Sequence, residues 1–343
     1  MPGGVAVLQR LGLAEAAGGA PFYGVRYHFG NHTAEGKFPS IPGLSASGCG
    51  QRRKHLDAVL FNAAAETPGV TAHTGVNVDG PHWEGGRVVG LSVAGEVRRA
   101  KLVVAADGVH SRIRRLLGLE MPVSRKRLGA RAHFCLAPDR EQPPWVDVFV
   151  RPGHELYVTP LPNHEVLVAA LADASSLGDT MEGTFHCWWK SELELCSRLD
   201  GAEQVTPLLC TSPLAGRARA GVSRGVVLLG DAAGFLDPIT GGGMTQALMT
   251  AELLAKFVRR GLERTDDWLW AFESERQALL RDYRILTQMV LWLADHPHLT
   301  EHVLSAFRVS PALLSHLIGV SGGMKPLVGF SRRGLGGKFS PCE

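Results

Sequence analysis

Apolar residues recur along the chain with helical spacing in some segments and with strand spacing in others. Leu56, Val59 and Leu60 share one face of a predicted helix, which Pro68-Gly69 would end. The same reading extends to the rest of the chain. In order, the pattern predicts a helix over 5–17, a strand over 23–29, a helix over 52–65, a strand over 70–78, three short strands over 83–105, strands over 128–136, 146–150, 155–160 and 166–171, a helix near 181–199, a strand over 226–229, and helices from 244 to about 317.

Two kinds of strand are visible in this pattern. Leu102–Ala105 and Val226–Leu229 are apolar throughout, which is typical of a parallel sheet covered on both faces. The four strands between 128 and 171 have prolines between them, and their close spacing favours an antiparallel sheet. The sequence therefore predicts an α/β fold with an inserted antiparallel sheet.

Composition narrows the class of protein. The 343 residues are 45% hydrophobic and 20% charged, with a formal net charge of +3, as in ordinary globular proteins. The basic clusters Arg112–Arg115 and Arg125–Arg127 are short, so we interpret them as solvated faces or helix ends and expect no nucleic-acid partner. No apolar run is long enough to span a bilayer. Contact with a membrane surface stays open.

The six cysteines are scattered, without C-x-x-C or zinc-like spacing. We therefore expect reduced thiols, no metal site and a cytoplasmic location. Nothing in the sequence indicates an oligomeric state.

The first segment with chemical character follows the apolar strand that ends at Ala105. Asp107-Gly108 comes directly after this strand, and a helix is predicted to start at once. Ligands of open α/β sheets bind at the carboxyl ends of strands, where a carboxylate can accept hydrogen bonds from ribose-type hydroxyls. Ser111 and Arg114, in the first helical turn, could meet a phosphate. The structural alternative, Asp107 as a simple helix cap, is equally compatible with the pattern.

The second segment follows the strand 226–229. Gly230-Asp231 ends that strand, and Pro238 and the glycines Gly241, Gly242 and Gly243 precede a long helix. Three glycines in a row cost conformational entropy, but they expose bare amides at the positive end of a helix dipole. This arrangement favours an anionic or electron-accepting group against the backbone rather than a plain turn.

Together the segments resemble the group A flavin monooxygenase superfamily, which includes aromatic hydroxylases and squalene-type epoxidases. Asp107–Arg114 looks like its D-G-x-x-S-x-x-R motif, and Gly230–Thr245 looks like its G-D motif with proline and a glycine-rich helix start. Arg53–Leu60 matches its R-x-x-L-D-x-x-L helix opening, and Pro2–Leu13 matches the stretch ahead of that helix. Order and spacing agree over about residues 2–255.

The resemblance implies a domain organisation. An FAD-binding, Rossmann-like domain would comprise 1–120 and 215–262, interrupted by a substrate-binding β-sheet domain over 121–214. A helical region would follow over 263–325, with a flexible tail over 326–343. Family members begin with a strand–GxGxxG–helix–strand unit, and this sequence contains no GxGxxG. A truncated gene model is favoured over natural loss, and the chain as written would lose the pyrophosphate-binding amides and a central strand of this unit.

The resemblance also implies the cofactor and its contacts. Asp231 would bond the ribitol of FAD, Pro238 would lie against the ring, and the helix start at 241–245 would face the flavin pyrimidine edge. Arg53 would reach the pyrophosphate, with Asp107-Gly108 nearby, where NAD(P)H is also connected. The cofactor-binding residues predicted in this way are Arg53, Asp107, Gly108, Gly230, Asp231, Pro238, Gly241, Gly242, Gly243, Met244 and Thr245.

Three functions remain after this comparison. The first is an NAD(P)H-dependent monooxygenase that uses O2 and a flavin C4a-hydroperoxide to hydroxylate or epoxidise an apolar or aromatic small molecule. The second is a geranylgeranyl reductase-like flavoprotein that reduces double bonds, because Gly230–Pro238 is closer to that group and to flavin halogenases. The halogenase W-x-W-x-I-P signature is absent. The third is an inactive homologue. Such chemistry needs no fixed side-chain acid or base, so no catalytic residue is predicted, and the histidines are interpreted as surface or core residues.

Overall fold

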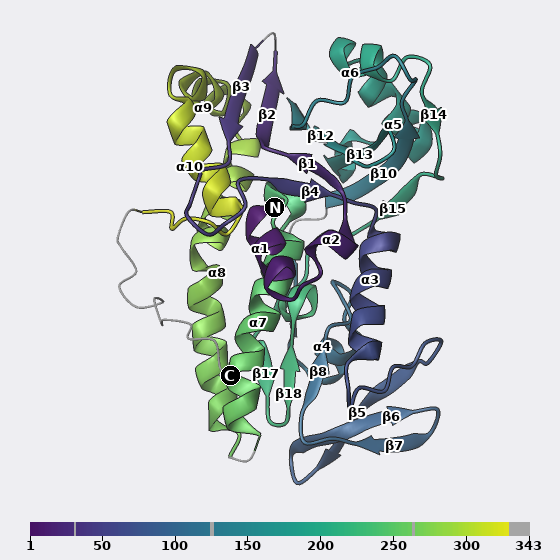
Figure 1. Cartoon of the computed structure of the whole chain (residues 1–343), viewed down its shortest axis with the longest axis vertical. Helices are drawn as coiled ribbons and strands as arrows, with labels where there is room; N and C mark the ends of the chain where they lie inside the picture. Colours follow the sequence, from purple (N-terminus) through teal and green to yellow (C-terminus); the bar gives the residue numbers. More distant parts are fainter. Residues whose placement is uncertain (31, 124–126, 263–264, 329–343) are drawn as a thin grey trace.

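A large β-sheet forms one end of the molecule (Figure 1). The structure is a computed structural model that describes residues 1–30, 32–123, 127–262 and 265–328. The sheet has the strand order β14-β10-β13-β12-β11-β2-β3, and β15 also pairs with β10. Its strands are β2 (Gly24–Phe29), β3 (His32–Lys37), β10 (Arg127–Cys135), β11 (Val146–Arg151), β12 (His154–Pro160), β13 (Glu165–Asp173), β14 (Glu203–Gln204) and β15 (Leu209–Thr211).

The four strands predicted between 128 and 171 are confirmed as β10 to β13. Each pairs antiparallel with its neighbour in the sheet. The hairpin of β2 and β3 extends the same sheet, because β2 runs parallel to β11. Residues 24–37 therefore belong to this sheet, although the boundary proposed from the sequence placed residues 1–120 in the other domain. The pairing of β2 with β11 joins segments about 120 residues apart, which periodicity alone does not reveal.

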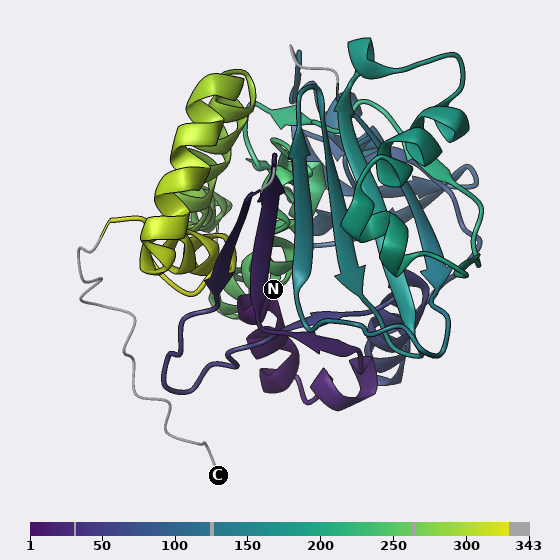
Figure 2. The ribbon, with the colours of Figure 1, turned by 90° about the horizontal axis from the view of Figure 1, so that it is seen from above.

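Helices cover both faces of this sheet (Figure 2). On one face α5 (Met181–Lys190) and α6 (Leu193–Arg198) bury Phe185 and Leu195 against β10, β12 and β13. On the other face α9 (Pro297–Val309) and α10 (Pro311–Ser321) pack on the β2–β3 hairpin.

The helix predicted near 181–199 is two helices rather than one. The break falls between α5 and α6, where Glu192 has extended backbone angles. The buried Glu192 carboxylate forms an ion pair with Arg151 of β11. The helix therefore breaks at this ion pair, although the apolar pattern of the sequence continues through it.

The second part of the molecule is built on a small sheet of order β17-β18-β8. β8 (Val103–Ala105) and β18 (Val226–Leu228) are parallel neighbours, and β17 (Val222–Ser223) pairs with β18. The pairing confirms that the two apolar strands belong to one parallel sheet. The prediction that both faces of the sheet are covered is wrong for β8, since Val104 is 45% exposed.

Two long helices and a meander pack around this small sheet. α7 (Gly243–Gly261) and α8 (Asp267–Ala294) lie side by side, and Phe272 of α8 is fully buried beneath β17 and β18. β5 (Val78–Glu84), β6 (Arg87–Val93) and β7 (Glu96–Arg99) form the antiparallel meander at the opposite end from the large sheet (Figure 1). The helices predicted beyond 244 are confirmed.

Two predictions near the N-terminal half need correction. The helix predicted over 5–17 is α1 (Pro2–Arg10) and α2 (Ala14–Ala17), separated at Gly12, which has a φ of 70°. The strand predicted over 70–78 does not form, because in the described structure no neighbouring strand pairs with it before β5 begins. The predicted helix α3 (Arg53–Glu66) is confirmed, but none of its residues is buried.

The remaining elements are short. They are β1 (Ala20–Phe22), which pairs with β4 (Gly48–Gly50), β9 (Glu120–Met121), which pairs with β16 (Arg217–Ala218), the helix α4 (Arg112–Leu116), and the 3₁₀ turns η1 (Ala174–Ser176), η2 (Gly230–Ala233) and η3 (Pro238–Thr240). The predicted tail includes residues 329–343, which lie outside the described residues.

Within the described ranges, no single helix is long and apolar enough to cross a membrane. Only α9 and α10 together, bent by 109°, reach the required length and hydropathy.

Candidate functional site

The two motifs recognised in the sequence meet at one edge of the small sheet. β8 and β18 are parallel, so the chain segments that leave their carboxyl ends lie side by side. Arg114, which is 1% exposed, joins these segments. Its Nη1 donates to the carbonyl oxygens of Asp231 and Ala232, at 3.3 and 3.1 Å. Its Nη2 donates to Val109 O at 2.6 Å and to the Glu120 carboxylate at 3.1 Å.

In the first motif, the side chains of Asp107 and Ser111 form hydrogen bonds within the motif itself. Ser111 Oγ donates to Asp107 Oδ1 at 2.5 Å and accepts from the Arg114 amide at 3.0 Å. Asp107 Oδ2 accepts from the Ile113 amide at 3.1 Å. Ser111 and Arg114 were expected to face a phosphate, and this is wrong, because both are buried and occupied by protein partners.

Asp107 itself keeps an exposed carboxylate at the start of α4. Its carboxylate accepts from Ser111 Oγ and the Ile113 amide, but the N-cap of α4 is Ser111, so the alternative reading of Asp107 as the helix cap is wrong. Gly108 has a φ of 81° and open space where a Cβ would lie. That Asp107 and Gly108 bind FAD stays a prediction.

The second motif supplies a half-buried carboxylate. Gly230 has a φ of 58°, a conformation that turns the chain from β18 into η2. Burial raises the pKa of the Asp231 carboxyl, and the positive charge of Arg53 at the start of α3 partly offsets that rise. Arg53 and Asp231 thus lie within electrostatic reach. In the part of the chain that the structure describes, the Asp231 carboxylate has no hydrogen-bond partner.

The start of α7 carries uncompensated amides. Gly242 is its N-cap and offers no side-chain acceptor, and no acidic residue stands in the first turn. Gly241 has a φ of 66°, in the left-handed region that favours glycine. Met244 is 51% exposed, while Thr245 is buried against Gly3 and Gly4 of α1. The positive end of this 19-residue helix is therefore not neutralised by a capping side chain or by an acidic residue of its own first turn.

A buried ion cluster fixes the loop between η2 and α7 to the large sheet. Arg127 of β10, 3% exposed, bonds Glu155 of β12 and, at 3.1 Å, Oδ1 of Asp237. Asp237 Oδ1 also accepts from the Ile239 amide at 2.9 Å, and so holds Pro238 in η3. Burial raises the pKa of Glu155, and the charge of Arg127 opposes that rise.

This cluster was not predicted from the sequence. Arg127 stands in a short basic run that was interpreted as solvated, because its partners lie 28 and 110 residues away in the chain. The sequence signal that could have indicated the cluster is Asp237, an acidic residue directly before Pro238.

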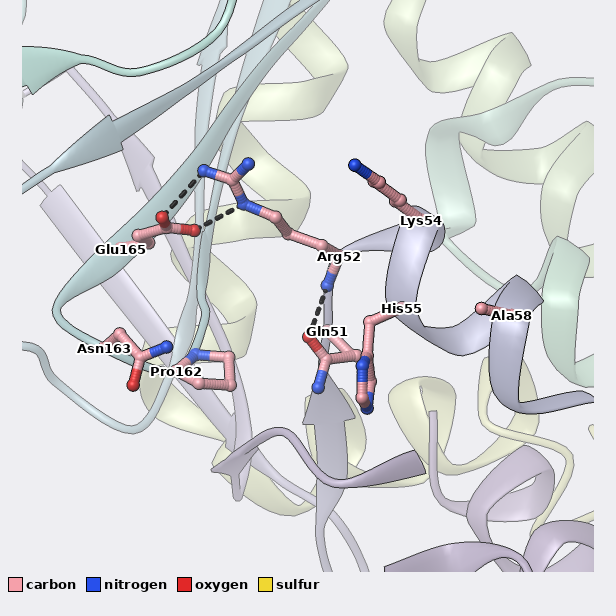
Figure 3. A pocket seen from close by; sticks show the side chains of 8 residues that line it. All are labelled: Gln51, Arg52, Lys54, His55, Ala58, Pro162, Asn163 and Glu165. Carbon is pink, nitrogen blue, oxygen red and sulfur yellow. Dashed lines mark hydrogen bonds and ion pairs between the residues drawn. The ribbon is translucent and has the colours of Figure 1, made fainter. Parts of the chain in front are cut away.

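A cavity of about 600 Å³ lies at the start of α3 (Figure 3). Arg52 crosses it to Glu165 of β13, with Nε–Oε2 and Nη2–Oε1 distances of 2.5 and 2.7 Å. Lys54 points into the open space and makes no bond with the other residues drawn. Arg53, which was predicted to bind FAD, lies in the chain between the lining residues Arg52 and Lys54. Its guanidinium forms an ion pair with Asp57, one turn further along α3. The cavity wall comprises Gln51, Arg52, Lys54, His55, Ala58, Pro162, Asn163 and Glu165.

Comparison with known proteins decides the family. A family model described as "FAD binding domain" matches residues 3–283. The chain belongs to this FAD-binding family. The match includes both motifs, α3 and the start of α7.

Solved structures of flavoproteins share the fold of this FAD-binding protein. A flavoprotein/dehydrogenase from Cytophaga hutchinsonii superposes with a TM-score of 0.77 at 20% identity, covering 93% of this chain and 82% of that one. The myxobacterial chondrochloren halogenase CndH, described as FAD-dependent, superposes with a TM-score of 0.71 at 19% identity, covering 97% and 84%. At such identities the likeness concerns the fold.

Curated relatives include digeranylgeranylglycerophospholipid reductases. That of Methanocella arvoryzae is 26% identical over 221 residues, which is 61% of this chain and 55% of the relative. That of Methanosphaerula palustris is 26% identical over 265 residues, 68% of this chain and 61% of the relative. The chain thus spans somewhat more than half the length of these relatives.

The residues at the edge of the small sheet fit FAD. Asp231 offers an unpaired carboxylate for ribitol hydroxyls, and the uncapped amides of α7 suit the electron-rich edge of a flavin ring. Arg53 adds a cation within electrostatic reach of Asp231. FAD would supply hydride and electron transfer, while the protein supplies position and electrostatics.

Proposed function

We propose that this protein is an NAD(P)H-dependent flavin monooxygenase that hydroxylates or epoxidises an apolar or aromatic small molecule with O2. The observation that carries the proposal is the uncapped start of α7 beside the unpaired Asp231 carboxylate. Reduced flavin carries negative charge on its N1–C2=O edge, and a helix N-terminus stabilises that charge. Gly242, Gly243 and Met244 would present their amides to it, and Asp231 and Arg53 would orient the ribitol and pyrophosphate.

The first test concerns FAD itself. Asp231→Ala removes the acceptor for ribitol hydroxyls, and we expect about tenfold weaker FAD binding, or roughly 1.4 kcal/mol. Titration of the purified chain, followed by flavin fluorescence quenching, measures the Kd. Glu96→Ala, which removes an exposed carboxylate on β7, serves as the matched control and leaves the Kd unchanged. Equal Kd values for Asp231→Ala and the parent chain would contradict the assignment of Asp231. A chain that takes up no FAD at all would support an inactive homologue.

A second candidate function is reduction of a carbon–carbon double bond. The names of the curated relatives favour it. Geranylgeraniol distinguishes the two reactions, because its double bonds can be either epoxidised or saturated. The FAD-loaded protein is incubated with NADPH and ¹⁸O2, and the product is identified by mass spectrometry. Monooxygenation gives a product that contains one ¹⁸O atom. A product that gains two hydrogen atoms and no ¹⁸O, formed equally well without oxygen, would replace the monooxygenase assignment by a reductase.

A further inference from the structure

The short turn η3 is bound by side chains from several distant parts of the fold. Tyr157 of β12 donates its hydroxyl to the carbonyl oxygen of Ile239, at 3.0 Å. Thr287 of α8 forms a hydrogen bond with Thr240, with 3.0 Å between the two Oγ1 atoms. The large sheet and α8 therefore both hold this three-residue turn.

The end of α10 adds a third contact. Ser321 Oγ donates to the carbonyl oxygen of Thr240 at 2.5 Å. Ser321 and Thr287 are both buried, so loss of either hydroxyl would leave a partner on the turn without its bond. Burial raises the pKa of the Tyr157 phenol well above its usual value, and this hydroxyl therefore stays protonated and remains a donor.

α8 and α10 also pack directly against the start of α7. A Cβ built on Gly242, the N-cap of α7, would lie 2.4 Å from Tyr283 Cε2 and 3.0 Å from the backbone oxygen of Ser321. These distances leave no room for a side chain at position 242. The glycine is therefore required by packing from α8 and α10, whatever binds on the other side of the helix start.

The connection between η3 and α7 is very short. Gly241 and Gly242 alone separate Thr240, the last residue of η3, from the first residue of α7. The Gly241 amide donates back to the carbonyl oxygen of Pro238 at 2.8 Å. A displacement of η3 therefore also displaces the first amides of α7.

We propose that Tyr157, Thr287 and Ser321 are positioning residues, which hold the start of α7 in place and thereby set the reduction potential of bound FAD. This inference rests on the proposed function, in which the start of α7 faces the flavin edge. A helix N-terminus stabilises the negative charge of reduced flavin, and the effect falls off within the first turn. Loss of one of these hydroxyls makes FAD harder to reduce, because the amides move away from that charge.

The first measurement needs no FAD. Tyr157→Phe, Thr287→Val and Ser321→Ala each remove one hydroxyl and keep most of the side-chain volume. Hydrogen exchange of the full 343-residue chain is followed by mass spectrometry over residues 237–246, which include the amides that donate within η3 and the first turn of α7. We expect these amides to exchange about tenfold faster in each variant, because one of the bonds that hold the turn is lost.

The second measurement uses the FAD-loaded chain. Equilibration with a reference dye gives the ratio of reduced to oxidised flavin at a fixed ambient potential. We expect this ratio to fall about tenfold in each variant, which corresponds to about 30 mV for a two-electron couple.

Two further variants separate positioning from a loss of stability. Thr287→Ser keeps the hydroxyl and should restore the exchange and the potential of the parent. Thr206→Val removes a hydroxyl that accepts from the His133 amide at 2.9 Å in the large sheet. It should lower the free energy of unfolding and leave both the exchange over 237–246 and the potential unchanged.

Unchanged exchange over 237–246 in the three hydroxyl variants would overturn the inference. A parent-like potential in variants that bind FAD and exchange faster would overturn it as well, and would leave the proposed function standing. A parent chain that takes up no FAD would instead overturn the proposed function, together with the effect on the potential.

Discussion

Replacement of Arg114 by leucine is expected to destabilise the protein by about 3–5 kcal/mol and to abolish FAD uptake. The Arg114 guanidinium holds the carbonyl oxygens of Asp231, Ala232 and Val109, and leucine would leave these acceptors without a donor. The chain from β18 into η2 would lose its connection to α4, and with it the position of the Asp231 carboxylate. Urea unfolding measures the first effect, and flavin fluorescence titration measures the second.

Arg112 provides the matched control for this experiment. It stands on the same helix, two residues away, but is exposed. Arg112→Leu is therefore expected to change the free energy of unfolding by about 0.5 kcal/mol or less. If Arg114→Leu behaved like Arg112→Leu in both measurements, Arg114 would not be the connection between the two motifs.

Replacement of Asp147 by alanine is expected to cost about 3–5 kcal/mol, because it removes the buried carboxylate that Arg26 and Arg198 share. Asp147 is fully buried in β11. Its carboxylate accepts from Arg26 Nε at 2.7 Å, from His28 Nε2 at 2.8 Å and from Arg198 Nη1 at 2.8 Å. These residues come from β2 and α6, so the loss should loosen both elements from the large sheet.

An exposed aspartate in a similar pair gives the comparison. Asp200 pairs with Arg140 at 2.8 Å and is 73% exposed, so Asp200→Ala should cost no more than about 1 kcal/mol. Urea unfolding of both variants measures the difference. Equal losses would show that the buried cluster contributes no more than a surface ion pair.

The Asp147 cluster also predicts a pH dependence. Burial alone would raise the pKa of Asp147, but hydrogen bonds from His28 and Arg26 and the charge of Arg198 outweigh it, so that the pKa lies well below its usual range. The folded state therefore holds this proton less tightly than the unfolded chain does. The extra stability is present above about pH 4, the ordinary carboxyl range, and is lost as the pH falls further. Asp147→Asn should have a flatter stability profile below pH 4 than the parent chain, and identical profiles would contradict the assignment.

Local sequence pattern was sufficient for much of the architecture. The spacing of apolar residues predicted β10 to β13, α3 and α7, since a side-chain period of two or of 3.6 residues depends only on near neighbours. The two apolar strands were recognised as parts of a parallel sheet because they are apolar throughout. That Asp107 and Asp231 both lie near FAD was implied by the family resemblance and not by the spacing of residues.

The partners of charged residues could not be predicted in this way. Arg114 and Arg127 stand in short basic runs that look solvated, yet both are buried. The acceptor carbonyl of Asp231 lies 117 residues from Arg114, and Asp237 lies 110 residues from Arg127. Periodicity does not connect residues more than 100 positions apart. The local sequence around an arginine therefore does not show whether its side chain is exposed or buried.

The sequence by itself determined most helices and strands, the two strand ends that carry Asp107 and Asp231, and the glycine-rich start of α7. The tertiary structure alone decided where the helices predicted over 5–17 and near 181–199 divide, that β2 and β3 join the large sheet, that residues 70–77 form no strand, and that Arg114 and Arg127 bind the segment from η2 to η3. The physical reason is one of range. Periodicity and capping arise from neighbours within a few residues, whereas strand pairing and burial of charge depend on segments that only folding brings together.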